Sequence, residues 1–236
     1  MCQDCGCGDV NLVPLELQTR ILARNDSTAE HNRQHLRERG IFTVNLMGSP
    51  GSGKTAVLES TARIFKDGRR LAAIAGDLAT DNDAARLVRA GIRSCAIETG
   101  QACHLDAEMV HHELHHLDLE GVEFLFIENV GNLVCPAVYD LGQSVNVVAL
   151  SVTEGEDKPL KYPTMFAKAD LVLLTKLDLL PHLPRVDINA IRNAIAKVMP
   201  DPHIIRMSAQ DDVGVDGWVA WLRARRAALM HETVPA

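Results

Sequence analysis

The feature that most constrains this chain is a glycine-rich segment between an apolar run and a helix-like stretch. Residues 48–55, GSPGSGKT, match the pattern GxxxxGKS/T of phosphate-binding loops, and they follow the apolar run 41–47. Glycines allow backbone N–H groups to converge on phosphate oxygens, and the helix that begins near residue 54 adds a positive partial charge. We therefore predict a nucleotide-phosphate site, and its residues are Gly48, Gly51, Ser52, Gly53, Lys54 and Thr55.

Other apolar runs alternate with helix-like segments along the rest of the chain. They lie at 70–75, 122–128, 145–151, 170–175 and 203–207. This alternation predicts βαβ units and a three-layer α/β fold with a mainly parallel sheet, as in P-loop nucleotide triphosphatases. A length of 236 residues fits one such domain with a short appendage. We expect a nucleotide-binding domain over 14–236, with a helical lead-in, and a flexible cysteine-rich N-terminal extension over 1–13.

Charge and hydropathy exclude two classes of partner. The formal net charge of −7 argues against binding to nucleic acid or to an anionic membrane surface. The apolar runs are far shorter than the about 20 residues that cross a bilayer, and the N-terminus lacks a basic-then-apolar signal pattern. We expect a cytoplasmic protein.

Several residues near the loop are candidates for catalysis. Lys54 is expected to reach the β and γ phosphates, and the Thr55 hydroxyl to bind Mg²⁺. Asp77 and Glu128 each end an apolar run, so either could hold Mg²⁺ or orient the attacking water, and Asp81 is a third candidate. We assign Lys54, Asp77 and Glu128 to catalysis, and Thr55 and Asp77 to Mg²⁺.

Two further segments resemble motifs of GTPases. Residues 128–131, ENVG, occupy the place of the DxxG switch, in which the N–H of the glycine, here Gly131, senses the γ-phosphate. Residues 175–178, TKLD, resemble the guanine-specificity motif NKxD, although Thr175 replaces the usual asparagine. In that reading Asp178 accepts hydrogen bonds from guanine N1 and N2, and the Lys176 stem lies over the ring. Slow hydrolysis is expected, because no arginine is clearly placed as a finger.

Cysteines and histidines form two candidate metal sites. Cys2, Cys5 and Cys7 form a CxxCxC cluster of soft ligands, for which Ni²⁺ is plausible and Zn²⁺ or Cu⁺ are alternatives. Cys103, His104 and Cys135 flank the nucleotide-linked segments. They leave a tetrahedral site one ligand short, so water or a second subunit would complete it.

The segment HHELHH, residues 111–116, formally satisfies the zinc-protease pattern HExxH through His112 and His116. No third ligand follows nearby, so we expect a solvated helical face, with weak metal binding by His111, His112, His115 and His116 as the alternative. Cys95 has no ligand partner at suitable spacing and is expected to be structural.

The motifs MCQDCGCG, GSPGSGKT, TGQACHLDAEMV, FLFIENVGNLVCPAVYDLG and TKLDLLP together resemble the hydrogenase nickel-incorporation GTPases, the HypB family of the SIMIBI class. The resemblance covers nearly the whole chain. It implies GTP hydrolysis coupled to nickel delivery to the large-subunit precursor of NiFe-hydrogenase, a HypA-type metallochaperone as partner, and a GTP-dependent homodimer. It also implies nickel at Cys2, Cys5 and Cys7, and nickel or zinc at Cys103, His104 and Cys135.

Some members of that family carry a long histidine-rich tract after the N-terminal cysteines. Residues 8–40 contain only His31 and His35, which favours metal delivery over storage. Three rival interpretations fit less well. A urease-type nickel GTPase would not be expected to show the CxxCxC cluster, a storage protein would not need Lys54, and the signature lysine of a nitrogenase-type ATPase would fall at Ser49.

Overall fold

The computed structural model describes residues 15–66, 70–77, 80–100 and 102–232. Seven parallel strands form one sheet in the order β3-β2-β4-β1-β5-β6-β7. The strands are β1 (Phe42–Gly48), β2 (Leu71–Asp77), β3 (Arg93–Glu98), β4 (Phe124–Glu128), β5 (Val145–Ser151), β6 (Leu171–Thr175) and β7 (Ile204–Arg206). The mainly parallel α/β fold expected from the sequence is confirmed.

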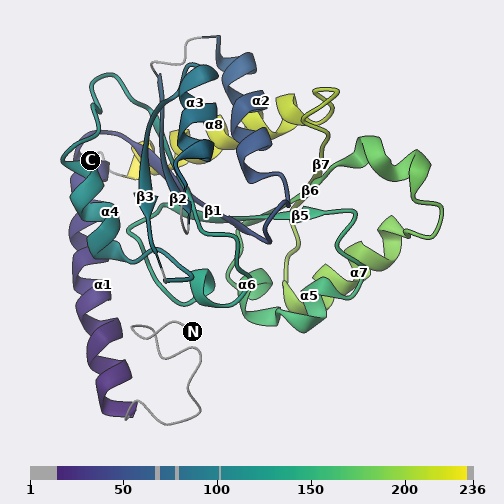
Figure 1. Ribbon diagram of the computed structural model, residues 1–236, viewed down its shortest axis with the longest axis horizontal. Coiled ribbons are helices and arrows are strands. Elements are labelled where there is room, and N and C mark those ends of the chain that lie inside the picture. Colours follow the sequence, from purple (N-terminus) through teal and green to yellow (C-terminus); the bar gives the residue numbers. More distant parts are fainter. Residues whose placement is uncertain (1–14, 67–69, 78–79, 101, 233–236) are drawn as a thin grey trace.

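Helices cover both faces of this sheet, which gives the three layers that the alternating pattern predicts (Figure 1). The α-helices are α1 (Leu15–Glu38), α2 (Lys54–Phe65), α3 (Asn82–Arg89), α4 (Ala107–Leu114), α5 (Lys158–Lys161), α6 (Pro163–Ala167), α7 (Ile188–Val198) and α8 (Val215–Glu232). The described residues also form the short 3-10 helices η2 (Cys135–Ala137) and η3 (Leu177–His182).

The apolar core divides according to the two sheet faces. On one face, alternate residues of β1, including Val44 and Leu46, pack against α2, α3 and α8. On the other face, Met47 packs with α6 and α7, and a separate group around Ile74 and Leu125 packs with α1 and α4. The last helix, α8, packs on the first of these faces, and its Trp218 is fully buried there.

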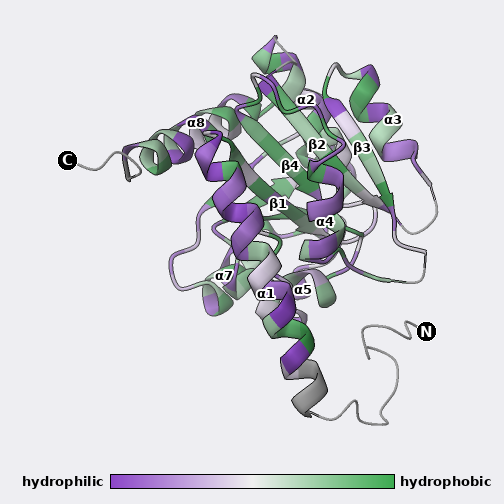
Figure 2. Cartoon of the chain, turned by 90° about the vertical axis from the view of Figure 1, so that its left-hand side faces the viewer, coloured by the Kyte–Doolittle hydropathy of each residue, from purple (hydrophilic) through white to green (hydrophobic). Residues whose placement is uncertain are grey.

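Figure 2 shows the apolar strands inside the molecule, with α1 and α4 side by side in front of one face of the sheet. The strand β3 was not foreseen, because its residues RSCAIE do not form a continuous apolar run and are mostly half-buried. Within the described chain, no helix is long and apolar enough to cross a membrane.

Central β1 pairs with β4 on one side and with β5 on the other, so the chain order reverses at its carboxyl end. Ligands of open α/β sheets bind at such a reversal, outside the carboxyl ends of the strands. The fold therefore places the loop after β1, the end of β4 and the end of β6 at one edge of the sheet.

Candidate nucleotide and metal site

The phosphate loop connects β1 directly to α2. Gly48 closes the strand with a φ of 154°, and a Cβ added there would lie 2.4 Å from the Ala149 carbonyl oxygen, so no larger residue fits. Gly53 has a φ of 98° and is the N-cap of α2, and no side chain in the described chain caps this helix. The N–H groups of its first turn are therefore available to an anion.

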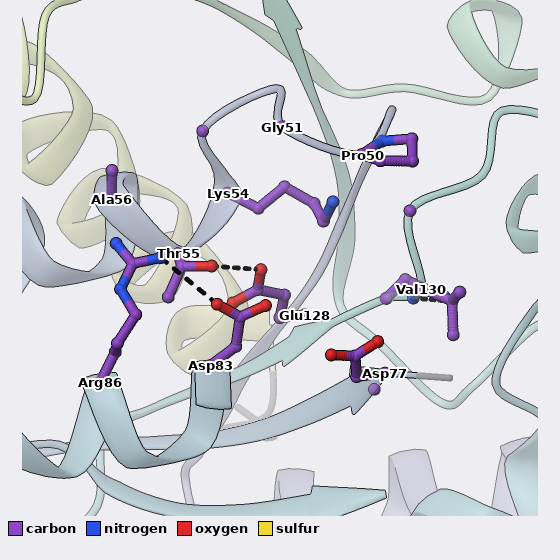
Figure 3. A pocket seen from close by; sticks show the side chains of 14 residues that line it. Pro50, Gly51, Lys54, Thr55, Ala56, Asp77, Asp83, Arg86, Glu128 and Val130 are labelled. Atoms are coloured by element: carbon purple, nitrogen blue, oxygen red, sulfur yellow. Dashed lines mark hydrogen bonds and ion pairs between the residues drawn. The ribbon is translucent and has the colours of Figure 1, made fainter. Parts of the chain in front are cut away.

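A cavity of about 410 Å³ lies in front of this loop (Figure 3). Lys54 Nζ donates to the carbonyl oxygens of Gly48 and Ser49, at 3.4 and 3.3 Å, and burial lowers its pKa. Thr55 Oγ1 donates to Glu128 Oε1 at 2.8 Å, and Asp77 lines the same cavity. The three residues assigned to catalysis therefore meet in one place.

Glu128 has an unusual environment for a carboxylate. It is 3% exposed, and burial raises its pKa to about 7, although Lys54 and the Thr55 hydroxyl lower it. Its Oε2 is buried and has no hydrogen-bond partner among the described residues. An unpartnered carboxylate oxygen beside a threonine hydroxyl is the type of oxygen donor set that Mg²⁺ takes, so the residues fit that ion.

Two charged residues of α3 also line the cavity and were not foreseen from the sequence. Arg86 makes ion pairs with Glu59 at 2.8 Å and with Asp83 at 3.3 Å. Asp81, the third carboxylate considered, is the N-cap of α3 and lies outside the residues lining the cavity. The sequence indicates Asp83 and Arg86 only through their place in the helix that follows Asp77, the carboxylate at the end of β2.

A second cavity, of about 360 Å³, lies on the other side of the α2 N-terminus, and Thr175, Lys176 and Asp178 line it. Thr175 Oγ1 donates to the Ser52 carbonyl oxygen at 2.6 Å, which joins the end of β6 to the phosphate loop. Asp178 Oδ1 accepts from Ser208 Oγ at 2.8 Å. Ser208 follows β7 and was not foreseen.

Gly131 lies directly against the phosphate loop. A Cβ at this glycine would lie 2.8 Å from Pro50 Cγ and 2.9 Å from Pro50 N, so only glycine permits this approach. The next residue, Asn132, forms an isolated β-bridge with Gly48. The switch-like segment after β4 is thus in contact with the loop through backbone atoms.

The same segment reaches the predicted cysteine and histidine ligands. Cys103 Sγ lies 3.2 Å from Cys135 Sγ and 3.9 Å from His104 Nδ1. The three ligand atoms all lie within 4.8 Å of one another, which is close enough for one ion. His104 is buried and stacks on Tyr139 with ring centroids 4.0 Å apart. Burial lowers the pKa of His104, which favours the neutral ring that metals bind.

Two asparagines, the buried Asn129 and the half-buried Asn132, hold the 128–135 segment to the 103–105 turn. Asn132 Nδ2 donates to the Cys103 carbonyl oxygen at 3.1 Å. Asn129 Oδ1 accepts from Leu105 N at 3.3 Å. Neither asparagine was singled out from the sequence, because an amide side chain has no motif that reveals a distant partner.

Comparison with known proteins decides the family. Residues 42–206 match the family model "CobW/HypB/UreG, nucleotide-binding domain". The hydrogenase maturation factor HypB of Azotobacter vinelandii is 49% identical over 223 residues, which cover 94% of this chain and 73% of that protein. The HypB of Escherichia coli strain K12 is 47% identical over 214 residues, covering 91% of this chain and 73% of that protein. The chain belongs to the HypB family.

Solved structures agree with this assignment. HypB from Helicobacter pylori, determined in complex with nickel, superposes with a TM-score of 0.82 at 37% identity, covering 90% of this chain and all of that one. The maturation factor HypB from Archaeoglobus fulgidus gives a TM-score of 0.79 at 39% identity, covering 87% of this chain and all of that one. The signal recognition particle protein of Aeropyrum pernix, at 15% identity, shares the P-loop GTPase fold alone.

Three other predictions for this HypB-family chain concern the N-terminal cysteines, the HHELHH segment and Cys95. Cys2, Cys5 and Cys7 fall outside the described residues, as does the proposed boundary between 13 and 14. Of the HHELHH segment, His112, His115 and His116 are exposed as expected, whereas His111 is half-buried. Cys95 is half-buried, and burial raises the pKa of its thiol to about 12.

Proposed function

We propose that this HypB-family protein is a GTP-hydrolysing nickel metallochaperone that delivers nickel to the large-subunit precursor of NiFe-hydrogenase during maturation. The names of its relatives support this assignment, since several are hydrogenase maturation factors and one was solved with nickel. A HypA-type nickel metallochaperone is its proposed partner. Cys2, Cys5 and Cys7 are proposed to hold nickel at the N-terminus.

In this proposal the first cavity binds the triphosphate. The loop N–H groups and Lys54 contact the phosphate oxygens, and Thr55 and Asp77 would hold Mg²⁺, with Glu128, which accepts from Thr55, as a further ligand. Mg²⁺ would neutralise charge that develops on the phosphates during hydrolysis. The unpartnered Oε2 of Glu128 supports its role as a ligand.

The second cavity supports guanine as the base. Asp178 lies beside the loop, where its carboxylate can accept two hydrogen bonds from guanine N1 and N2. Adenine offers no matching pair of donors. Ser208 holds the carboxylate in place, and Thr175 fixes the distance between the base site and the phosphates.

Cys103, His104 and Cys135 are proposed to hold nickel or zinc as cargo, with the fourth ligand from water or a second copy of the chain. A second copy is favoured by the surface around Cys135, because Val134 and Val138 are 56% and 44% exposed. A GTP-dependent homodimer would bury these valines and bring two metal sites together.

The single observation that carries the coupling is the path from loop to metal ligands. Gly48 forms a bridge with Asn132, and Asn132 donates to the Cys103 carbonyl. A γ-phosphate that shifts this segment would change the spacing of Cys103 and Cys135. Such coupling is reciprocal and is typically worth about 1 to 3 kcal/mol, or about 5- to 150-fold in affinity.

The test measures GTP and ATP hydrolysis by the reduced, metal-free protein with Mg²⁺, before and after Ni²⁺ is added. Four proteins are compared: wild type, Cys103→Ala, Asn132→Ala and Asn193→Ala. Asn193 is an exposed residue of α7 and serves as the matched control for Asn132. Nickel binding to each variant is measured in parallel by equilibrium dialysis with GDP and with a non-hydrolysable GTP analogue.

We expect GTP-selective hydrolysis whose rate nickel changes in wild type and in Asn193→Ala. Asn132→Ala should hydrolyse GTP but lose the effect of nickel, and Cys103→Ala should lose both the effect and the weaker class of bound nickel. Hydrolysis that nickel never affects would reject the coupling. Absence of nucleotide turnover would reject the GTPase itself.

A further inference from the structure

Four histidines from two helices gather at the contact between α1 and α4, on a surface that the nucleotide cavity does not include. His31 and His35 lie one turn apart on α1, and His111 and His115 lie one turn apart at the end of α4. Ring centroids are 5.2 Å apart for His31 and His111, 6.5 Å for His35 and His115, and 4.7 Å for His111 and His115. Figure 2 shows the two helices side by side, with α4 against the middle of α1.

Two of these rings direct the same nitrogen at each other. His111 Nε2 and His115 Nε2 are 3.2 Å apart. Two imidazoles that bind one ion tetrahedrally, with metal–nitrogen distances of about 2.0 to 2.1 Å, place their nitrogens about 3.3 to 3.4 Å apart. The observed pair therefore needs only a small adjustment to hold a cation between the two rings.

A buried side chain sets the proton position on His111. Asn32 is fully buried and donates through Nδ2 to the carbonyl oxygens of Ala107 and Leu141, at 2.9 and 3.4 Å. Its amide orientation is thereby determined, and Oδ1 faces His111 Nδ1 at 2.9 Å. Because an amide oxygen only accepts, His111 Nδ1 must carry the proton. Nε2 then holds the lone pair in the neutral ring.

This arrangement is typical of metal-binding histidines, whose second nitrogen donates to an oxygen that fixes the tautomer and the ring orientation. It differs from the other histidine pair of the segment. The rings of His112 and His116 are also 4.7 Å apart, but the His112 side chain is 71% exposed and its Nδ1 contacts Glu113. The two pairs have the same ring spacing and the same chemistry. Only the pair of His111 and His115 has a buried residue, Asn32, that orients one of its rings, and histidines of α1 beside it.

We propose that His111 and His115 form an imidazole pair that binds a divalent first-row cation, Zn²⁺ or Ni²⁺, beside the contact between α1 and α4. Imidazole suits both ions, and a site with no thiolate holds them less tightly than the cysteine sets, so it would release metal more readily. Water completes the coordination, because Cys103, His104 and Cys135 are the only set of three or more such ligands within 4.8 Å of one another among the described residues. The site goes beyond the proposed function, since it uses no nucleotide and no residue of the cavity.

The test follows each imidazole ring separately. The full reduced chain, with its histidines labelled with ¹⁵N in the ring, is examined by two-bond ¹H–¹⁵N correlation spectroscopy without metal and during addition of Zn²⁺ beyond the amount bound by the thiolates. Equilibrium dialysis with metal analysis counts the bound Zn²⁺ in wild type, His115→Gln, His31→Gln and the matched double variant His112→Gln/His116→Gln. His115 and His31 are exposed, so these replacements leave the core intact.

We expect metal-free His111 to be the Nδ1–H tautomer, and Zn²⁺ to shift the Nε2 resonances of His111 and His115 together. His115→Gln should lose about one equivalent of the weaker bound Zn²⁺, whereas His31→Gln and the double variant should match wild type. The proposal is overturned if His111 carries its proton on Nε2, if His115→Gln retains that equivalent, or if the double variant loses it. Binding remains measurable whether or not the protein hydrolyses GTP.

Discussion

Glu128 gives the metal-free, nucleotide-free protein a specific dependence of stability on pH. Burial raises the pKa of this carboxyl group from 4.5 to about 7 in the folded protein. Between these two values the folded protein binds more protons than the unfolded chain, so its free energy of unfolding falls as pH rises. The neutral acid is compatible with its buried position, whereas the charged form has one oxygen without a partner among the described residues.

The loss of unfolding free energy on raising the pH follows from the difference between the folded and unfolded pKa values of Glu128. The two pKa values lie about 2.5 apart, and each unit is worth about 1.4 kcal/mol. The full destabilisation is therefore about 3 kcal/mol, of which a small part is present at about pH 5 and nearly all at about pH 8. Replacing Glu128 with glutamine removes it, so the variant should gain about 2 to 3 kcal/mol relative to wild type between those pH values.

The assay is urea unfolding followed by far-ultraviolet circular dichroism, in EDTA and without nucleotide, at both pH values. Wild type, Glu128→Gln and the exposed-surface control Glu120→Gln are compared, because the difference between proteins cancels the other titrating groups. Equal denaturant slopes are required for the comparison. The free energies of unfolding of Glu120→Gln and wild type should change in parallel with pH. If those of Glu128→Gln and wild type also change in parallel, the inferred pKa of Glu128 is wrong.

Other residues yield predictions that need one measurement each. Asp178→Ala should bind GDP no better than ADP while unfolding like wild type, which competition binding measures; retained guanine preference would contradict the base site. Trp218 is fully buried and donates to Thr61, so Trp218→Ala should lose about 3 to 5 kcal/mol of stability in urea, and a loss below 1 kcal/mol would be inconsistent with its packing. Gly131→Ala should weaken GTP binding, because its Cβ meets Pro50 at 2.8 Å. An unchanged dissociation constant for GTP would show that the 128–135 segment moves away from the loop at no cost to binding. Gly217→Ala, whose Cβ meets nothing within 4 Å, should stabilise α8 by about 0.5 to 1 kcal/mol, a gain that thermal unfolding detects.

Most of the fold could be predicted because its signals are local. Buried parallel strands appear as continuous apolar runs, and the phosphate loop marks the junction of the first strand and its helix. The exception is β3, an edge strand whose first four residues are only half-buried. Its burial depends on neighbouring strands, and a single run of six residues does not reveal them.

The candidate site was predictable only in part for a related reason. Residues within motifs, such as Lys54 and Asp178, are recognisable by spacing. Asp83 and Arg86 line the phosphate cavity because α3 follows the end of β2 closely, and Ser208 supports Asp178 because β7 pairs with β6. These positions result from the packing of elements far apart in sequence, which no local pattern encodes.

The arrangement around Asn132 explains why the nucleotide and metal sites should not act independently. Its backbone is joined to Gly48, its side chain to the Cys103 carbonyl, and Cys135 lies three residues further along the same segment. Gly131 already lies against Pro50 with no room for a Cβ, so a phosphate that displaces the loop must also displace this segment. Any metal that prefers one spacing of Cys103 and Cys135 must then favour one position of the loop. Because the preference is mutual, nickel should change nucleotide affinity by the same factor by which the nucleotide changes nickel affinity. Unequal factors at equilibrium would mean that a third state, such as the proposed dimer, takes part in the linkage.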